Sequence, residues 1–121
     1  MTHLLVVAHG SRREDSNVQI RELIEQLRLA PTRFTAIDCA FLEIAEPTIA
    51  QGLHQQIANG AGQIVVMPYF LSAGRHVSID IPEQVQRIRD MHPQIDIRIA
   101  NHLGAAEKIR GIAIDLASLA I

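Results

Sequence analysis

The sequence predicts one α/β domain, a three-layer sandwich in which a four-stranded parallel sheet of order 2-1-3-4 carries helices on both faces. Four apolar, β-branched segments alternate with four segments of helical periodicity, and short connections rich in turn residues join them. Alternating strands and helices of this size form a parallel sheet through right-handed crossovers. The chain has 121 residues, 48% of them hydrophobic, which is enough for a single core. We therefore expect one domain over residues 1–121.

The first strand is expected over residues 4–8, and the helix after it ends before Pro31, which cannot continue a helix. Ser11 and Glu14 have the spacing of a capping box, which predicts that this helix begins directly after the strand. Helical spacing gives the helix one apolar face, formed by Ile20, Leu23, Ile24 and Leu27.

The second strand is expected over residues 34–41, followed by a helix that starts at Glu46 and Pro47 and ends in the glycine-containing region 60–62. Proline suits the first turn of a helix because its missing N–H is not needed there. The inner face of this helix is predicted to consist of Ile49, Leu53 and Ile57.

The third strand is expected over residues 64–69, and the third helix opens around Asp80 and Pro82 and ends before Pro93. This helix is predicted to bury Val85, Ile88 and Met91. Residues 95–100 alternate between isoleucine and more polar positions, which is typical of an edge strand. A C-terminal helix follows, with an inner face made of Ile109, Ile112, Ala113, Leu116 and Ala120.

Composition excludes several classes of function. A net charge of −2 and a pI near 6.3 give no general electrostatic reason to bind nucleic acid or an anionic membrane. No apolar stretch approaches the roughly 20 residues that cross a bilayer. The single cysteine, Cys39, has no partner for an internal disulfide, and the chain begins without a basic leader, so we expect a cytoplasmic protein. Walker, dinucleotide-binding and serine-hydrolase motifs are absent.

Reactive side chains follow the predicted strands at their carboxyl ends, where open parallel sheets bind ligands. His9 follows the first strand, Glu43 the second and His76 the third. Imidazole ligates borderline divalent metals and exchanges protons near neutral pH, so one site can do both. A histidine taken singly is more often structural, and Glu43 alone is also suited to capping the next helix or pairing with an arginine. Their convergence at one edge favours a functional site.

Other residues at the same edge are less specific. Three arginines, Arg12, Arg13 and Arg75, flank the proposed site, and guanidinium groups suit the carboxylates of a polyanionic substrate. His102 follows the fourth strand and fits either a supporting or a surface role. For Cys39 we expect a core position, and for His3, His54 and His92 we expect solvated positions.

Three sequence segments, in the order in which they occur in that family, closely resemble the short sirohydrochlorin cobaltochelatases. The similarity spans nearly the whole chain. They are Val-Ala-His-Gly-Ser-Arg at 7–12, Phe-Leu-Glu-Ile-Ala-Glu-Pro at 41–47 and Met-Pro-Tyr-Phe-Leu-Ser-Ala-Gly-Arg-His-Val at 67–77. The resemblance implies a chelatase half-domain that inserts a divalent metal, Co²⁺ first, into a tetrapyrrole. It also implies that two copies form a homodimer, because longer relatives contain two such halves in one chain.

The resemblance implies roles for individual residues. His9 and His76 bind the metal and assist pyrrole deprotonation, and Glu43 is a further ligand or proton acceptor. No ATP and no cofactor beyond the metal substrate are implied. We assign substrate contacts to the first loop and to the loop after the third strand, namely Ser11, Arg12, Arg13, Tyr69, Phe70, Leu71, Ser72, Ala73, Gly74 and Arg75.

Three alternatives stay open at this point. Two imidazoles and a carboxylate choose weakly among first-row metals, so Ni²⁺ or Fe²⁺ can replace Co²⁺ as the metal. A histidine phosphatase also places His-Gly after its first strand, but it needs an arginine directly before the histidine, where this chain has Ala8. A non-catalytic metal carrier would keep His9 and His76 without needing the arginines.

Overall fold

The computed structural model describes residues 1–121 and confirms a parallel sheet of order β2-β1-β3-β4. All neighbouring strands pair in parallel, and β4 is an edge strand, as predicted. The observed bounds lie within two residues of the predicted ones: β1 is Thr2–Ala8, β2 Ala36–Phe41, β3 Gln63–Pro68 and β4 Asp96–Ile99.

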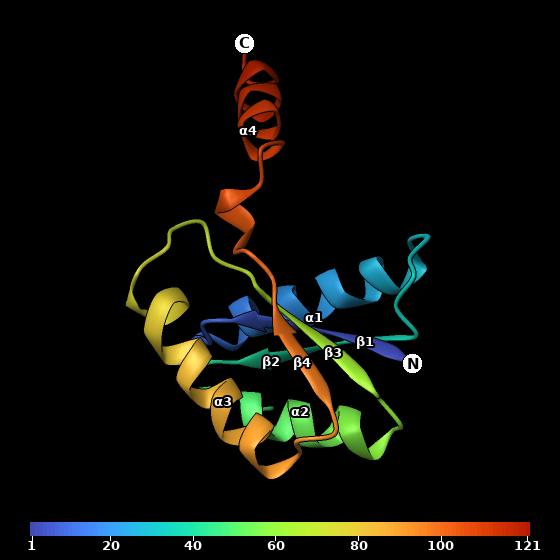
Figure 1. Cartoon of the computed structure of the whole chain (residues 1–121). Helices are drawn as coiled ribbons and strands as arrows, with labels where there is room; N and C mark the ends of the chain where they lie inside the picture. The colour runs from blue at the N-terminus through green and yellow to red at the C-terminus, as the bar shows by residue number, and fades with distance from the viewer.

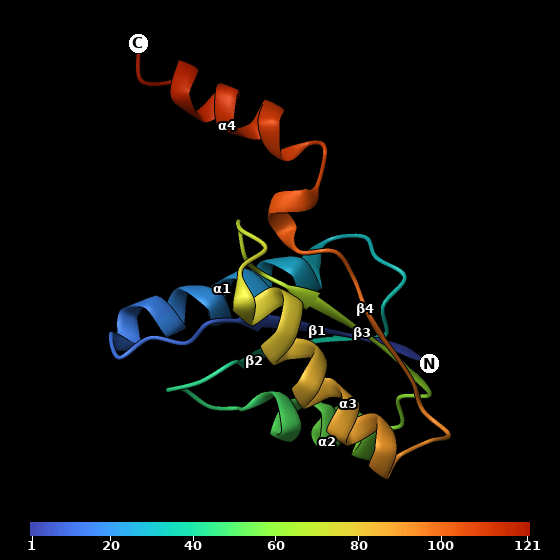
Figure 2. The ribbon, with the colours of Figure 1, turned by 60° about the vertical axis from the view of Figure 1, so that its left-hand side comes forward.

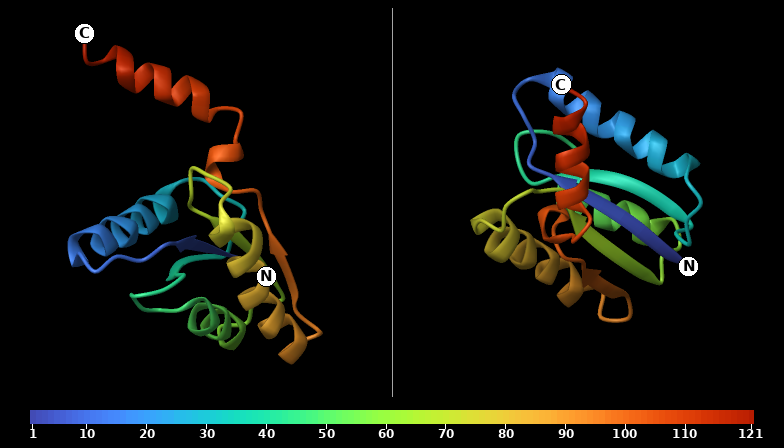
Figure 3. Two further views of the ribbon diagram at one scale, coloured as in Figure 1. Left: turned by 90° about the vertical axis from the view of Figure 1, so that its left-hand side faces the viewer. Right: turned by 90° about the horizontal axis from the view of Figure 1, so that it is seen from above.

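Helices cover both faces of this sheet, as predicted. One helix, α1 (Glu14–Leu29), lies on one face, while α2 (Ile49–Ala58) and α3 (Ile81–Met91) lie side by side on the other (Figures 1 and 2). The fourth helix, α4 (Ile109–Ser118), follows a 3₁₀ turn and extends away from the sheet (Figure 3). None of the four helices is both long and apolar enough to span a membrane.

The two faces of β1 explain the two core clusters. Leu5 and Val7 point to the α2–α3 side, where they join the larger cluster with fully buried residues such as Leu53 and Val85. Val6 points to the α1 side and packs with Ile24. This alternation is the period of a strand buried on both faces, which fixes the register of the strands and therefore the positions of their carboxyl ends.

Two predicted helix starts are wrong. Ser11 does not cap α1, because the helix begins at Glu14 and the Ser11 hydroxyl instead accepts a hydrogen bond from Arg13 N at 3.0 Å within the preceding loop. The second helix begins after Pro47 rather than at it. Thr48 forms a reciprocal capping box with Gln51 there, which satisfies two free N–H groups at the start of α2.

Three burial predictions are also wrong. Met91 is 63% exposed at the end of α3, and His3 is only 2% exposed, within β1. The expected inner face of the C-terminal helix is absent, because α4 has no buried residue and makes its main contact with the 3₁₀ turn that precedes it. Helical spacing correctly identified the helix, but it could not identify what the apolar residues of that helix pack against.

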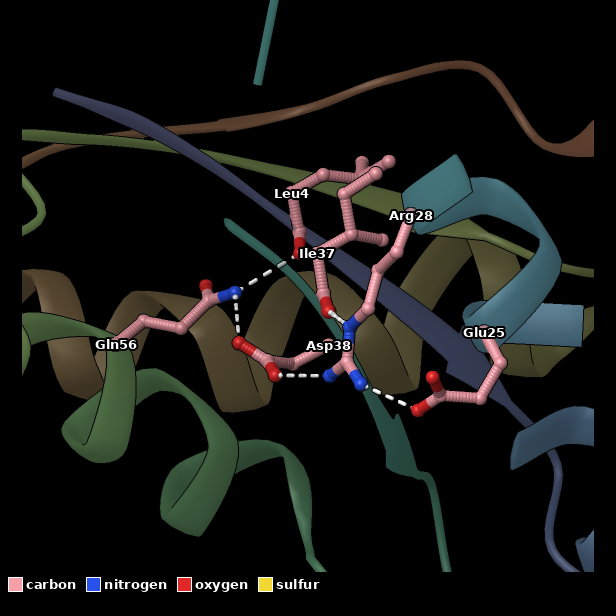
Figure 4. A network of polar contacts seen from close by, with 6 residues as sticks. All are labelled: Leu4, Glu25, Arg28, Ile37, Asp38 and Gln56. Atoms are coloured by element: carbon pink, nitrogen blue, oxygen red, sulfur yellow. Dashed lines mark hydrogen bonds and ion pairs between the residues drawn. The ribbon is translucent and has the colours of Figure 1, made fainter. Parts of the chain in front are cut away.

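A polar network holds β2 to the helices on either side of it (Figure 4). Arg28 of α1 donates from Nε to the Ile37 carbonyl at 2.8 Å and pairs with Asp38 at 2.8 Å. On the other side, Gln56 of α2 donates to the Leu4 carbonyl and to Asp38. The network satisfies backbone and side-chain groups at the open edge of the sheet, and so fixes the strand that leads to Glu43.

Candidate metal centre

His9, Glu43 and His76 converge at the carboxyl edge of the sheet. His9 directly follows β1, Glu43 lies two residues after β2, and His76 opens a short π-helix, His76–Asp80, after the loop that follows β3. One possible ligand atom from each of the three side chains lies within 4.8 Å of the others. The three segments that the sequence placed at one edge therefore meet in space.

The cluster is compact and open to solvent. His9 Nε2 lies 3.0 Å from Glu43 Oε1, and the centroids of the His9 and His76 rings are 4.9 Å apart. The side chains of His9, Glu43 and His76 are 43%, 53% and 43% exposed. A donor set of two imidazoles and one carboxylate suits a borderline divalent metal, and its exposure leaves room for further ligands.

Backbone contacts bring Glu43 to His9. Leu42 N donates to the Ala8 carbonyl at 2.9 Å and Glu43 N donates to the His9 carbonyl at 3.1 Å, which extends the contact between the two chain segments beyond the strands. Gly10 has a φ of +93°, and a Cβ atom there would lie 1.9 Å from the Glu43 carbonyl oxygen. Only glycine fits this crossing, so the His-Gly pair has a structural reason as well as a chemical one.

Hydrogen bonds orient both rings. His9 Nδ1 lies 2.8 Å from the Gly10 carbonyl, and His76 Nδ1 lies 2.8 Å from Asp80 Oδ2. Each acceptor favours a proton on Nδ1, which directs Nε2 toward a metal or a proton; in His9 this atom contacts Glu43 Oε1. Sequence reasoning used Asp80 only as the start of a helix and missed this contact. The four-residue spacing from His76 was the available signal.

The predicted substrate residues surround the cluster unevenly. Tyr69 and Phe70 are half-buried, and the Phe70 ring centroid lies 6.4 Å from that of His76. The rest of this loop is exposed, as are both arginines of the first loop; these residues are Leu71, Ser72, Ala73, Gly74, Arg75, Arg12 and Arg13. Ser11 is half-buried.

Asn17, a buried residue of α1, fixes the first loop. It accepts a hydrogen bond from Ser11 N at 2.9 Å and donates one to the Ser11 carbonyl at 2.8 Å. It also donates to Glu14, whose pKa is held below its usual value, chiefly by a hydrogen bond from Arg21 and then by Asn17. Sequence reasoning missed Asn17, although a polar residue at an inward helical position was a usable signal.

The remaining histidines lie outside the cluster. His102 is half-buried and is not among the three grouped side chains. Its neighbour Gly104 packs on the loop after β3, where its N–H donates to the Phe70 carbonyl at 2.9 Å. His54 and His92 contact each other at 3.3 Å between α2 and the end of α3.

A cavity of about 150 Å³ adjoins the cluster, whereas a larger one of about 430 Å³ lies between α1, β2 and α2.

Comparison with known proteins places this geometry in a family. The sequence profile of the CbiX family matches residues 3–118. The chain is 32% identical over 118 residues to the sirohydrochlorin ferrochelatase of Priestia megaterium, covering 95% of this chain but only 43% of that protein. It is 33% identical to the sirohydrochlorin cobaltochelatase of Saccharolobus solfataricus, covering 90% of this chain and 88% of the relative.

Solved structures agree with this assignment. A CbiX protein from Marinobacter aquaeolei VT8 superposes with a TM-score of 0.84 at 25% identity, covering 98% of this chain and 95% of the other. SirB from Bacillus subtilis subspecies spizizenii, a sirohydrochlorin chelatase solved in complex with cobalt, superposes with a TM-score of 0.85 at 27% identity, and the match covers half of its length. From the matched profile, the similar sequences and the shared fold together, we conclude that this chain belongs to the CbiX family.

Proposed function

We propose that the chain is a sirohydrochlorin chelatase that inserts a divalent metal, Co²⁺ in preference to Fe²⁺ or Ni²⁺, into the macrocycle. The observation that carries the proposal is the convergence of His9, Glu43 and His76 within 4.8 Å at an exposed edge of the sheet. Relatives named as sirohydrochlorin chelatases support the substrate. Cobalt is favoured because the Saccharolobus solfataricus relative, which matches this chain over 88% of its own length, is named as a cobaltochelatase.

Insertion breaks two pyrrole N–H bonds and forms bonds from the pyrrole nitrogens to the metal. In the proposed mechanism His9 and His76 present Nε2 lone pairs to the incoming ion. As the ion passes to the macrocycle, the two imidazole nitrogens that it leaves accept the two pyrrole protons. Glu43, at 3.0 Å from His9 Nε2, takes the proton from that ring and passes it to solvent. The exposed guanidinium groups of Arg12, Arg13 and Arg75 bind carboxylates at the rim of the macrocycle. The chain needs no ATP in this scheme.

The test is anaerobic absorption spectroscopy of sirohydrochlorin with each metal, compared with enzyme-free controls, because spontaneous insertion mimics catalysis. We expect enzyme-dependent acceleration that is strongest with Co²⁺. His9→Ala and His76→Ala should each remove most of it, whereas His54→Ala, on α2 outside the cluster, should keep it. If the enzyme accelerates insertion of none of the three metals, Co²⁺, Fe²⁺ and Ni²⁺, the chelatase proposal is rejected in favour of a metal carrier.

We also propose that two copies of the chain associate through α4. This helix has no buried residue, and Ile112, Ile114, Leu116 and Leu119 are between 52% and 82% exposed. It extends from the domain without packing on it (Figures 1 and 3). Exposed apolar side chains in this number mark an interaction site.

A second copy is the occupant that the fold favours. Along β3, buried Ile64 and Val66 face α2 and α3, while Val65 and Met67 on the α1 side are only half-buried. This side of the sheet has room for a second helix, and the chain spans about half the length of SirB. The proposed dimer exchanges α4 helices so that each one covers β3 of the partner subunit.

Sedimentation of the full-length chain at micromolar concentration tests the association. We expect a dimer, and we expect Ile112→Glu combined with Leu116→Glu to give a monomer, while Arg110→Ala, a polar change on the same helix, leaves the dimer intact. A wild-type chain that sediments as a monomer would contradict the proposed dimer.

A further inference from the structure

The π-helix His76–Asp80 contains an acidic residue whose role is not explained by packing. None of its five residues is buried, so the core does not require this unusual turn. The turn ends where Ile81 N donates to the His76 carbonyl. It aligns the side chains of His76 and Asp80, with Nδ1 and Oδ2 2.8 Å apart. Single π-helical turns within helices occur frequently at functional sites.

The contact determines which nitrogen of His76 faces the cluster. An ionised carboxylate only accepts hydrogen bonds, so His76 carries its proton on Nδ1 and keeps the lone pair on Nε2. Metal-binding histidines almost always donate their second ring N–H to a carboxylate, a carbonyl or water, which fixes the ring and strengthens it as a ligand. Asp80 gives His76 a charged acceptor, whereas the corresponding acceptor for His9 is the neutral Gly10 carbonyl.

Asp80 is itself held in place. Its side chain is 26% exposed, compared with 77% for Arg75, whose Nε lies 3.7 Å from Asp80 Oδ1. One carboxylate oxygen therefore faces His76 and the other faces an arginine of the loop after β3. Asp80 also lines the cavity of about 150 Å³ beside Glu43 and His76. It is therefore in position to hold the ring of His76 while the rest of the site stays open.

We propose that Asp80 is a positioning residue that orients His76 for metal binding through the Nδ1–H hydrogen bond. The inference rests on the proposed function, in which His76 is a metal ligand. It makes a separate claim, however, because it concerns the binding of the metal alone. It also predicts an asymmetry between the two histidines: loss of Asp80 should weaken the contribution of His76 and leave His9 bound to its own carbonyl acceptor.

Calorimetric titration of the full chain with Co²⁺ alone, without tetrapyrrole, tests the proposal. Asp80→Ala should raise the dissociation constant by about 10- to 100-fold, the effect expected for loss of such an orienting partner. Asp80→Asn keeps an acceptor oxygen and should recover a large part of the loss. Asp90→Ala, which removes an exposed aspartate of the following helix, α3, should bind Co²⁺ like the wild type.

Nitrogen NMR of the metal-free chain gives a readout that a merely structural role would not change. His76 should carry its proton on Nδ1 in the wild type and in Asp80→Asn, and should shift toward the Nε2–H form in Asp80→Ala, while His9 is unchanged. Wild-type Co²⁺ affinity in Asp80→Ala would overturn the proposal, as would an Asp80→Asn variant as weak as Asp80→Ala. If these variants behave as expected and no metal is inserted into sirohydrochlorin, the positioning role stands and the proposed function fails.

Discussion

Replacing Gly10 by alanine tests whether the backbone crossing between β1 and β2 holds the metal centre together. The new Cβ atom would lie 1.9 Å from the Glu43 carbonyl oxygen, whereas ordinary contact begins at 3.4 Å, so the two chain segments must separate by about 1.5 Å. This displacement is half of the 3.0 Å distance between His9 Nε2 and Glu43 Oε1. The change also places a side chain on a backbone with a φ of +93°, which disfavours alanine.

Two costs add in this variant. A left-handed backbone costs a non-glycine residue about 1–2 kcal/mol, and forcing extra volume into a packed region costs about 1–3 kcal/mol. We therefore expect unfolding free energy to fall by about 2–5 kcal/mol and the melting temperature by about 8–20 °C. Because misplacing catalytic groups by about 1 Å costs on the order of 100-fold in rate, metal insertion should fall by at least that factor.

Urea unfolding measures the loss of stability, and Co²⁺ titration measures the damage to the site separately. Gly62→Ala is the matched control, because its φ is not positive and its Cβ would meet only Met1 N at 4.0 Å. It should leave both stability and Co²⁺ binding nearly unchanged. A Gly10→Ala chain with wild-type stability and wild-type Co²⁺ affinity would refute the argument that this crossing positions Glu43 beside His9.

Two further substitutions and one pH dependence test the core and the network around β2. Gln56→Ala removes hydrogen bonds to Leu4 and Asp38 and should cost about 1–3 kcal/mol in urea unfolding; a loss below about 0.5 kcal/mol would show the network to be dispensable. Leu53→Ala leaves a cavity at a fully buried position and should lower the free energy of unfolding by about 2–5 kcal/mol. A variant as stable as the wild type would contradict the described core. Burial raises the pKa of the Cys39 thiol, so the folded chain keeps its proton at a pH where the unfolded chain ionises. The resulting stability is present below an unfolded pKa of about 8.5 and is lost as pH rises, and thiol-reactive dye should label native Cys39 more slowly than denatured chain at pH 8.5.

The sheet and the convergence of His9, Glu43 and His76 were predictable from sequence because both depend on local patterns. Apolar runs at residues 4–8 and 64–69 required strands buried on both faces, and the parallel crossovers then placed every carboxyl end at one edge. His9, Glu43 and His76 follow those ends directly, so their convergence needed no knowledge of side-chain geometry. For the same reason strand bounds were accurate to within two residues.

Features that depend on contacts between distant side chains were not predictable in this way. The spacing of Ser11 and Glu14 matched a capping box, but Asn17 of α1 binds both the N–H and the carbonyl of Ser11, which ties the preceding loop to the helix without making Ser11 its cap. His3 was expected in solvent, yet its strand lies at the centre of the sheet. The apolar spacing of α4 identified a helix but could not show that it leaves its own domain.

The position of His9, Glu43 and His76 after the ends of the strands has a consequence for how the protein can change. The core between the sheet and the helices α2 and α3 contains none of His9, Glu43 or His76, and the loop 71–75 beside His76 is exposed. Substitutions in that loop therefore alter the surroundings of the cluster without opening a cavity in the core. The loop can change in small steps while each intermediate still folds.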